Sequence, residues 1–205
     1  MFSQLAPTYI IHNFTDNHSG SFTTLQSKSI LSIARLSPEK GIDLLLQTAK
    51  KVLPLHPTWK WKLIGTGPLK KMVTDFIDQE NLNNHFILQK PNGSRLDDEY
   101  LNASLFVLSS RYESMSMVLL EAQSYGLPLI SFNCPDGPAE IISHDENGLL
   151  VPAENSDALA QAVLSLIENP SKAKKISHQA IVNAAQFNSE TVYAQWSSFF
   201  DKLLH

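Results

Sequence analysis

The chain has little of the material from which disulfide-bonded, metal-bound or membrane-spanning proteins are built. Its 205 residues contain one cysteine, Cys134, which excludes a disulfide within the chain and every zinc site made of cysteine pairs. No apolar run approaches the roughly 18 residues of a membrane-spanning helix. The seven histidines are dispersed without metal-ligand spacing, so we expect no metal. The shortage of cysteine is typical of a reducing compartment and predicts a cytoplasmic protein.

The chain also lacks the charge pattern of a nucleic-acid-binding protein. It has 16 basic against 20 acidic residues, a net charge of −4, and its lysines are scattered, so we expect no nucleic-acid partner. The first residues, MFSQLAPTYIIHNF, have no basic residue before the apolar part and no small-residue cleavage site, so they do not read as a secretion signal. With 43% hydrophobic and 18% charged residues, the chain is predicted to be a globular domain.

Six short β-rich runs alternate with longer helical patterns, which is typical of βαβ units with a parallel sheet. The predicted strands cover residues 29–34, 60–65, 85–88, 105–109, 128–132 and 149–151. The predicted helices cover 43–53, 69–79, 116–125, 156–168, 171–185 and 189–203, and the last three begin with serines that we expect to be N-caps. The sequence therefore predicts an α/β fold: a Rossmann-like parallel sheet of about six strands, helices on both faces and a helical tail. Residues 1–28 are expected to form an extended lead-in.

In such a sheet ligands bind beyond the carboxyl ends of the strands, so the residues after each strand carry most information. Arg35 and Lys40 follow the first predicted strand, in RLSPEKG. A guanidinium and a nearby ammonium suit phosphate oxygens, although a solvated turn with incidental charges is the alternative.

Gly65 and Gly67 follow the second strand, in GTGP, and let the backbone approach a ligand closely unless they form only a tight turn. The segment is neither a GxGxxG fingerprint nor a Walker-type phosphate loop, which argues against both of those nucleotide-binding modes.

The exit of the fourth strand carries two glutamates. Glu113 and Glu121 are eight residues apart, which on a helix turns them by about 80° relative to each other, so both can border one crevice. The free amides near residues 114–117 would favour an anion there. Glu113 could instead complement the helix dipole, whereas Glu121 stands among apolar residues, where a carboxylate needs hydroxyl or cationic partners. After the fifth strand, Glu140 is either a helix-start acid or a ligand, and Ser109 and Ser110 have no triad partners nearby in sequence.

Taken in order, these segments resemble the C-terminal, nucleotide-sugar-binding half of GT-B fold glycosyltransferases of family 4, the retaining type. The resemblance covers about residues 30–151 and rests on SIARLSPEKG, LIGTGP, SSRYESMSMVLLEAQSYGLPLI, GPAEII and NGLLV. YIIHNFTD, before them, resembles the interdomain linker, with His12 and Phe14 in place of the usual prolines. Ser114 and Ser116 stand where glycine or proline is commoner in the family.

The resemblance implies roles for individual residues. Arg35 and Lys40 would clamp the donor's diphosphate, Glu113 would hold hydroxyls of the sugar, and Glu121 would hold the ribose. The base would lie near Leu88. The implied catalytic residues are Arg35, Lys40 and Glu113, and the implied donor-binding residues are Gly65, Gly67, Leu88, Ser114, Met115, Ser116 and Glu121.

The resemblance also implies how the chain is organised: a lead-in and interdomain linker at 1–28, a nucleotide-sugar-binding domain at 29–188, and a helix at 189–205 that reaches toward an absent N-terminal domain. Val192, Trp196, Phe199 and Leu203 form a stripe on that helix, which could also be a plain core-facing stripe.

The implied activity is transfer of a hexose-type sugar, with retention, from a nucleoside diphosphate, UDP favoured, to a glycan or lipid-linked acceptor in bacterial polysaccharide or glycoconjugate synthesis. The acceptor would bind the missing domain, no cofactor or metal is expected, and the complete enzyme could associate with the inner membrane surface. Two alternatives remain open, a nucleotide-sugar epimerase of the same fold and a non-catalytic nucleotide-sugar-binding module. The fragment alone is expected to bind donor without transferring sugar.

Overall fold

A six-stranded parallel sheet forms the centre of the protein. The computed structural model describes residues 9–17, 19–92 and 96–204, so part of the predicted lead-in, 1–8, lies outside it. The strands are β1 (Ser29–Ile33), β2 (Lys60–Ile64), β3 (Phe86–Gln89), β4 (Leu105–Leu108), β5 (Leu129–Asn133) and β6 (Gly148–Pro152). They are ordered β3-β2-β1-β4-β5-β6, and every neighbouring pair is parallel. The six predicted strands and the Rossmann-like architecture are confirmed, with boundaries that differ by one residue at most.

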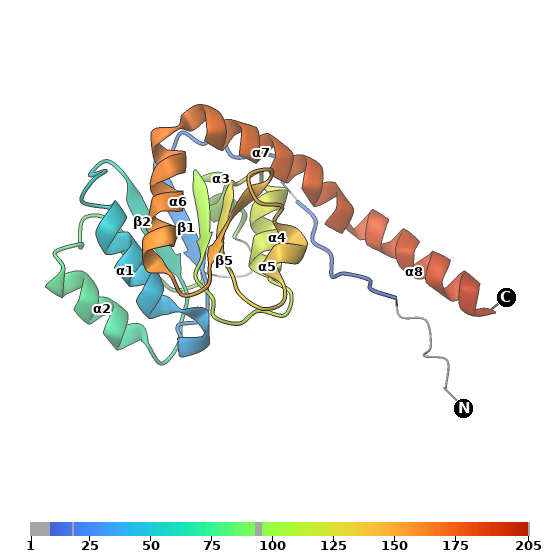
Figure 1. The fold of residues 1–205 in the computed structure, drawn as a ribbon, viewed down its shortest axis with the longest axis horizontal. Helices are drawn as coiled ribbons and strands as arrows, with labels where there is room; N and C mark the ends of the chain where they lie inside the picture. Colours follow the sequence, from blue (N-terminus) through green and yellow to red (C-terminus); the bar gives the residue numbers. More distant parts are fainter. Residues whose placement is uncertain (1–8, 18, 93–95, 205) are drawn as a thin grey trace.

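Helices cover both faces of this sheet (Figure 1). One face carries α1 (Ile42–Val52), α2 (Lys70–Gln79) and α6 (Ser156–Glu168), and the other carries α3 (Asp97–Leu101), α4 (Met117–Ser124) and α5 (Pro138–Ile141). Each face of the sheet has its own hydrophobic core, the first with α1, α2 and α6 and the second with α3, α4 and α5. Side chains along each strand alternate between these cores, so Ile30 lies in the first core and Leu31 in the second. α7 (Pro170–Ala184) then packs against both α6 and α4. Strands buried on both faces explain the continuous apolar runs in the sequence.

The predicted serine caps are wrong for the last three helices. The side chain of Asn155 accepts hydrogen bonds from the amides of residues 157 and 158, and Asn169 accepts one from the amide of Lys172. Asn188 does the same for the amide of Thr191 at the start of α8 (Ser189–Leu204). In each case the asparagine stands one or two residues before the predicted serine, and its side-chain oxygen reaches the free amides of the first turn. Pro170 occupies the first turn of α7, where its missing N–H leaves no bond unmade.

Four short elements were not predicted from the sequence. They are α3, α5 and the 3₁₀ turns η1 (Pro38–Lys40) and η2 (Ala185–Phe187). Each has at most five residues, which is too few to repeat an apolar position at helical spacing. η1 matters for the site because it carries Lys40.

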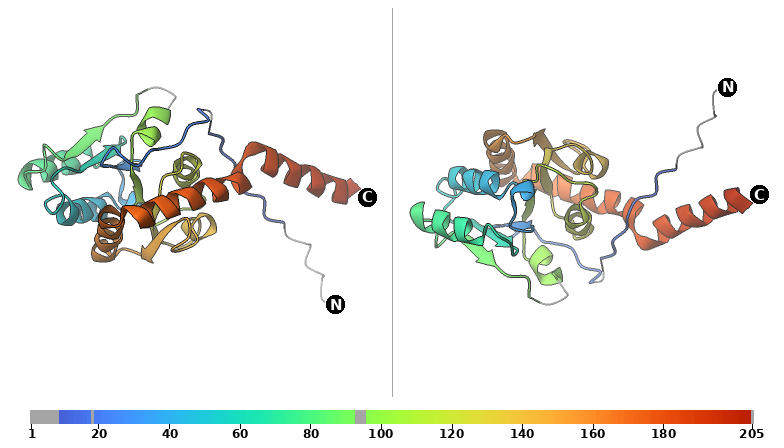
Figure 2. Two further views of the ribbon diagram at one scale, coloured as in Figure 1. Left: turned by 90° about the horizontal axis from the view of Figure 1, so that it is seen from above. Right: turned by 90° about the horizontal axis from the view of Figure 1, so that it is seen from below.

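The two ends of the described chain meet on one side of the domain (Figure 2). Residues 9–17 and 19–28 contain no helix or strand, and the amide of Thr15 donates to the carbonyl of Phe187 over 2.9 Å. Only Val192 of the predicted α8 stripe is fully buried, whereas Trp196 is 44% exposed and Leu203 is 64% exposed. Phe199 packs edge-on against Tyr9 with ring centroids 5.0 Å apart. The stripe is therefore not a core-facing one, and its contact with a further domain stays a prediction.

Candidate functional site

A cavity of about 690 Å³ opens at the carboxyl ends of the central strands. It lies at β1, where the order of the strands reverses: β2 and β3 follow on one side of β1 and β4 to β6 on the other. The cavity therefore occupies the topological switch point of the fold. Its walls come from the ends of β1, β2 and β4, the loops that follow them, and the first turn of α4. The lining residues are Ile33, Ala34, Arg35, Lys40, Ile64, Gly65, Thr66, Gly67, Pro91, Leu108, Glu113, Met115, Ser116, Met117 and Val118.

Seven of the ten predicted site residues line this cavity together: Arg35, Lys40, Gly65, Gly67, Glu113, Met115 and Ser116. Leu88, Ser114 and Glu121 are not among the lining residues. The roles assigned to all ten stay predictions, but strand exits far apart in the sequence do converge on one cavity.

Backbone segments cross closely at two glycines, Gly65, which lines the cavity, and Gly41, which follows Lys40. A Cβ on Gly65 would lie 1.9 Å from the carbonyl oxygen of Ala34. Gly41, which follows η1, has φ of +59°, and a Cβ there would lie 1.9 Å from the carbonyl oxygen of Ser109. The amide of Leu36 donates to the carbonyl of Thr66 over 2.9 Å, which joins the loops after β1 and β2. Glycine is required at both positions because any side chain would overlap a neighbouring carbonyl.

An ion pair between Lys40 and Glu113 stands in the cavity. Lys40 Nζ lies 2.7 Å from Glu113 Oε1, and the Ser110 hydroxyl donates to the same oxygen over 2.6 Å. The Glu113 side chain is 8% exposed and that of Lys40 27% exposed. The two residues expected to hold different parts of one ligand therefore hold each other here. Arg35 is exposed at the edge of the same cavity.

The Ser116 hydroxyl is a buried polar group that finds no partner among the described residues. Ser116 is 2% exposed, lines the cavity, and precedes the first residue of α4, yet its side chain makes no capping bond. The first amides of a helix have no intrahelical acceptor, and Met117 and Val118, the first two residues of α4, also line the cavity. A buried hydroxyl without a partner is unfavourable, and a ligand oxygen in the cavity would satisfy it. Ser114, by contrast, is exposed.

Glu121 lies one turn further along α4 and faces a separate cavity of about 220 Å³. The Tyr100 hydroxyl donates a short hydrogen bond to Glu121 Oε2, and the Tyr100 and Tyr125 rings stack with centroids 5.2 Å apart. Burial, followed by the Glu121 carboxylate, raises the pKa of Tyr100 well above its usual value, which keeps the hydroxyl protonated as a donor. The sequence analysis expected Glu121 to need a hydroxyl or cationic partner because its neighbours in sequence are apolar. In this structure that partner is the hydroxyl of Tyr100.

Leu88 lies within β3, where its side chain packs against the first core and its backbone pairs with Leu63 of β2. Pro91, two residues after the strand, is the part of this segment that lines the cavity. Thr66, Met117 and Val118 also line it and were not predicted.

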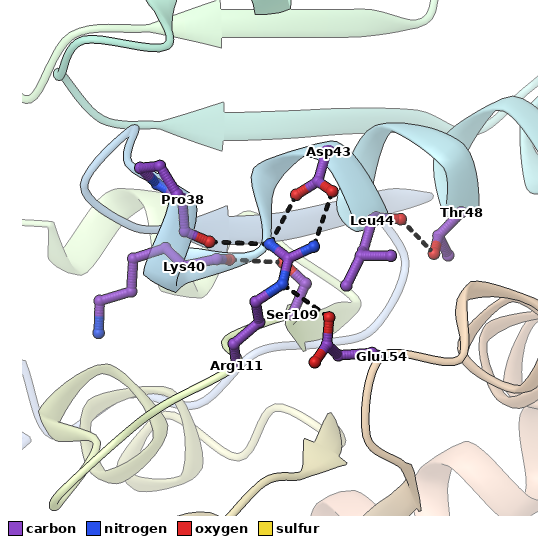
Figure 3. A network of polar contacts seen from close by, with 8 residues as sticks. All are labelled: Pro38, Lys40, Asp43, Leu44, Thr48, Ser109, Arg111 and Glu154. Carbon is purple, nitrogen blue, oxygen red and sulfur yellow. Dashed lines mark hydrogen bonds and ion pairs between the residues drawn. The ribbon is translucent and has the colours of Figure 1, made fainter.

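Arg111 is the main residue that the sequence analysis missed. It follows β4, and its guanidinium donates to both carboxylate oxygens of Asp43, to Glu154 and to the carbonyl of Pro38, each over 2.8 Å (Figure 3). Hydrogen bonding to Arg111 lowers the pKa of Asp43 and, from the same contact, raises that of Arg111. The available signal was its place: Arg111 is one of three arginines in the chain and, like Arg35, follows a strand.

Within residues 9–17, 19–92 and 96–204, no three His, Cys, Asp or Glu side chains gather closely enough to hold a metal ion. Across the same ranges no helix is both long and apolar enough to cross a bilayer.

The sequence profile described as "Glycosyl transferases group 1" matches residues 14–183. Among curated proteins, the chain is 32% identical over 183 residues to the exopolysaccharide phosphotransferase SCO2592 of Streptomyces coelicolor, covering 89% of this chain and 19% of that protein. It is 27% identical over 206 residues to the amylovoran biosynthesis glycosyltransferase AmsD of Erwinia amylovora, covering 96% of this chain and 57% of that protein.

A solved structure with the same fold is a TarM variant from S. aureus, in complex with fondaparinux, α-GlcNAc-glycerol and UDP. The two superpose with a TM-score of 0.85 at 26% identity, over 94% of this chain and 39% of that one. The chain therefore spans less than two thirds of the length of each of these relatives.

Proposed function

This chain belongs to the group 1 glycosyltransferases, and on that premise we propose that it is the donor-binding half of a retaining, family 4 enzyme that moves a hexose-type sugar from UDP. The observation that carries the proposal is the cavity at the switch point. There Arg35, Lys40, the first turn of α4 and the unpartnered hydroxyl of Ser116 surround one space. These groups all suit an anion with several oxygens, as a diphosphate is.

The cavity also holds a group suited to a sugar. Glu113 is an acceptor with two oxygens, and both of its donors in this structure, Lys40 and Ser110, bind the same one, Oε1. A carboxylate beside a diphosphate repels it, but it accepts hydrogen bonds from sugar hydroxyls well. We therefore assign the diphosphate to the cations and α4, and the sugar to the side of Glu113.

In this assignment the cations act on the leaving group. Negative charge grows on the departing diphosphate as the bond to the anomeric carbon breaks, and preorganised positive groups stabilise that charge. Arg35 and the amides of α4 stand at the cavity before the donor binds, whereas Lys40 has to exchange Glu113 for the diphosphate. We assign no attacking carboxylate.

The acceptor, a glycan or a lipid-linked glycan, would bind the part of the enzyme outside this chain. The TarM structure contains both UDP and a sugar derivative, and AmsD acts in amylovoran biosynthesis, which supports a role in polysaccharide or glycoconjugate synthesis. We place the complete enzyme in the cytoplasm, at the inner membrane surface, and propose that it needs no metal.

The proposal is tested by calorimetry on the 205-residue chain with UDP and with uridine. UDP should bind much more tightly than uridine in the wild type, and Arg35→Ala and Lys40→Ala should each weaken UDP while leaving the weak uridine binding nearly unchanged. Arg35→Lys should rescue only in part, because an ammonium lacks the bidentate fork. If the variants lose affinity equally for UDP and for uridine, the diphosphate assignment is wrong. If the wild-type chain binds neither ligand, the proposed function is wrong.

Two further measurements separate the proposal from an epimerase and from a binding module. An epimerase would turn over UDP-sugar without any acceptor, and a binding module would turn over nothing. A complete enzyme that consumes donor only when acceptor is present fits the transferase alone.

A further inference from the structure

Arg111 joins the two loops that carry the ion pair of the cavity. Lys40 belongs to η1, after β1, and Glu113 belongs to the loop after β4. Arg111 stands in the second of these loops and reaches across to the first, where it binds Asp43 in the opening turn of α1 and the carbonyl of Pro38 in η1 (Figure 3). Its Nε binds Glu154, which follows β6. One side chain thus fixes three segments.

Backbone contacts hold the same two loops together. The amide of Arg111 donates to the carbonyl of Glu39 over 2.9 Å, and the Ser109 hydroxyl donates to the carbonyl of Lys40 over 3.0 Å. Gly41 lies against the carbonyl of Ser109. The contacts therefore flank Lys40 on both sides along the chain, while its own ammonium is left to point at Glu113.

Arg111 itself is not among the residues that line the cavity. Its guanidinium makes four hydrogen bonds, to Asp43, Glu154 and Pro38, and its side chain is 23% exposed. Arg111 therefore acts on the donor through a residue that does line the cavity. Lys40 is such a residue, and in the sequence it lies between Pro38 and Asp43, which Arg111 binds.

We propose that Arg111 is a positioning residue: the clamp that it forms with Asp43 and Glu154 holds η1 against the loop after β4 and so sets where the Lys40 ammonium meets the donor's diphosphate. The inference rests on the proposed function, because it needs a diphosphate in the cavity. A planar guanidinium bound through Nη1 and Nη2 to both oxygens of one carboxylate fixes direction as well as distance, which a single ammonium does not. Displacements of about 1 Å at such groups have large effects on binding and catalysis.

The experiment is a double-mutant cycle on the 205-residue chain, with UDP as the probe. Arg111→Lys keeps the charge and removes the bidentate fork, so the fold should persist. We expect it to lower the affinity for UDP roughly five- to tenfold in the wild-type background. When Lys40 is already alanine, the affinity should fall by less than about twofold, because the effect acts through Lys40. A purely structural loss would weaken UDP equally in both backgrounds.

Lys50→Ala is the matched control. Lys50 also lies on α1 and forms an ion pair, with Glu80 at 2.8 Å, on the surface away from the cavity. It should lower the melting temperature about as much as Arg111→Lys while leaving UDP affinity unchanged. Asp43→Asn, which removes the negative charge and one of the two accepting oxygens, should reproduce the effect of Arg111→Lys.

The outcomes separate the two ideas. A wild-type chain that binds no UDP counts against the proposed function itself. A wild type that binds UDP, with Arg111→Lys binding equally well or losing affinity equally in both backgrounds, overturns the positioning role alone.

Discussion

Replacing Glu113 by glutamine should make UDP bind more tightly, although Glu113 lines the cavity. In this structure Lys40 and Glu113 lie 2.7 Å apart and neutralise each other. On the assignment proposed above, bare UDP has no sugar for Glu113 to hold. Its diphosphate then competes with Glu113 for Lys40 and is repelled by the negative charge of Glu113. Glutamine keeps the shape and the hydrogen-bonding oxygen of the side chain but removes the charge.

Two effects set the size of the change. A unit charge on Glu113 and one on a phosphate about 6 Å away interact by roughly 1 to 3 kcal/mol at effective dielectric constants of about 20 to 50. A hydrogen bond to a charged group contributes roughly 1.5 to 3 kcal/mol, and UDP has to break the one between Lys40 and Glu113 in the wild type. The substitution weakens that bond, which adds part of this energy to the binding of UDP. Screening reduces the sum because Lys40 is 27% exposed. We expect a net gain of about 1 to 2 kcal/mol, or roughly five- to thirtyfold in the dissociation constant of UDP.

The assay is calorimetry of UDP and UDP-sugars at pH 7.5 and two ionic strengths. The affinity for UDP should rise, and the rise should be smaller at high salt. The affinity difference between UDP-sugar and UDP should shrink because the sugar loses its hydrogen-bond acceptor. Glu99→Gln is the control, since Glu99 pairs with Lys62 at 2.6 Å with similar exposure but does not line the cavity. Weaker UDP binding by Glu113→Gln would refute the reasoning and would mean that Glu113 serves mainly to hold Lys40 in place.

Three further outcomes are expected. Ser116→Ala should weaken UDP binding by about 1 kcal/mol, the scale of one hydrogen bond. Ser114 is exposed, so Ser114→Ala should leave UDP binding unchanged, and calorimetric titration of both variants decides this. Glu121→Ala should weaken UDP and uridine alike, by roughly 1.5 to 3 kcal/mol, if it holds the ribose, and unchanged affinity with an intact fold would make it structural. Hydrogen bonding to Arg111 holds the pKa of Asp43 below its ordinary value of 3.8, so the stability from this pair is present above that pH and is lost as pH falls through the lower folded value. The difference in free energy of unfolding between wild type and Asp43→Asn should therefore shrink in acid, and a constant difference in urea titrations between pH 7 and pH 3 would contradict it.

Most of the fold could be predicted because buried parallel strands leave a plain signal. Runs such as ILSI in β1 and LFVL in β4 are apolar on both faces and are followed by polar residues or glycine. The caps were assigned wrongly because serine and asparagine stand next to each other at Asn155, and either side chain could reach the first-turn amides. α3 and α5 were missed because helices of five and four residues hold too few positions to show a periodic apolar pattern.

The site was predictable where it depends on strand exits and not where it depends on contacts between distant segments. Arg35 and Glu113 follow strands that are neighbours in the sheet, so the fold alone brings them to one cavity. The turn of about 80° between Glu113 and Glu121 allowed a shared crevice, but it could not show that Tyr100, from another segment, takes Glu121 as a partner. Arg111 meets Asp43 across 68 residues of sequence, and no local pattern encodes such a contact.

Two glycines at the carboxyl ends of the central strands restrict how the sequence around the cavity can diverge or be engineered. Gly65, which lines the cavity, and Gly41, which follows Lys40, tolerate no side chain, because a Cβ at either would lie 1.9 Å from a carbonyl oxygen. On the proposed assignment the sugar lies on the side of Glu113, and Met115, two residues further along the chain, also lines the cavity. A substitution series aimed at a different sugar should therefore vary Met115 and leave both glycines and Ser116 unchanged.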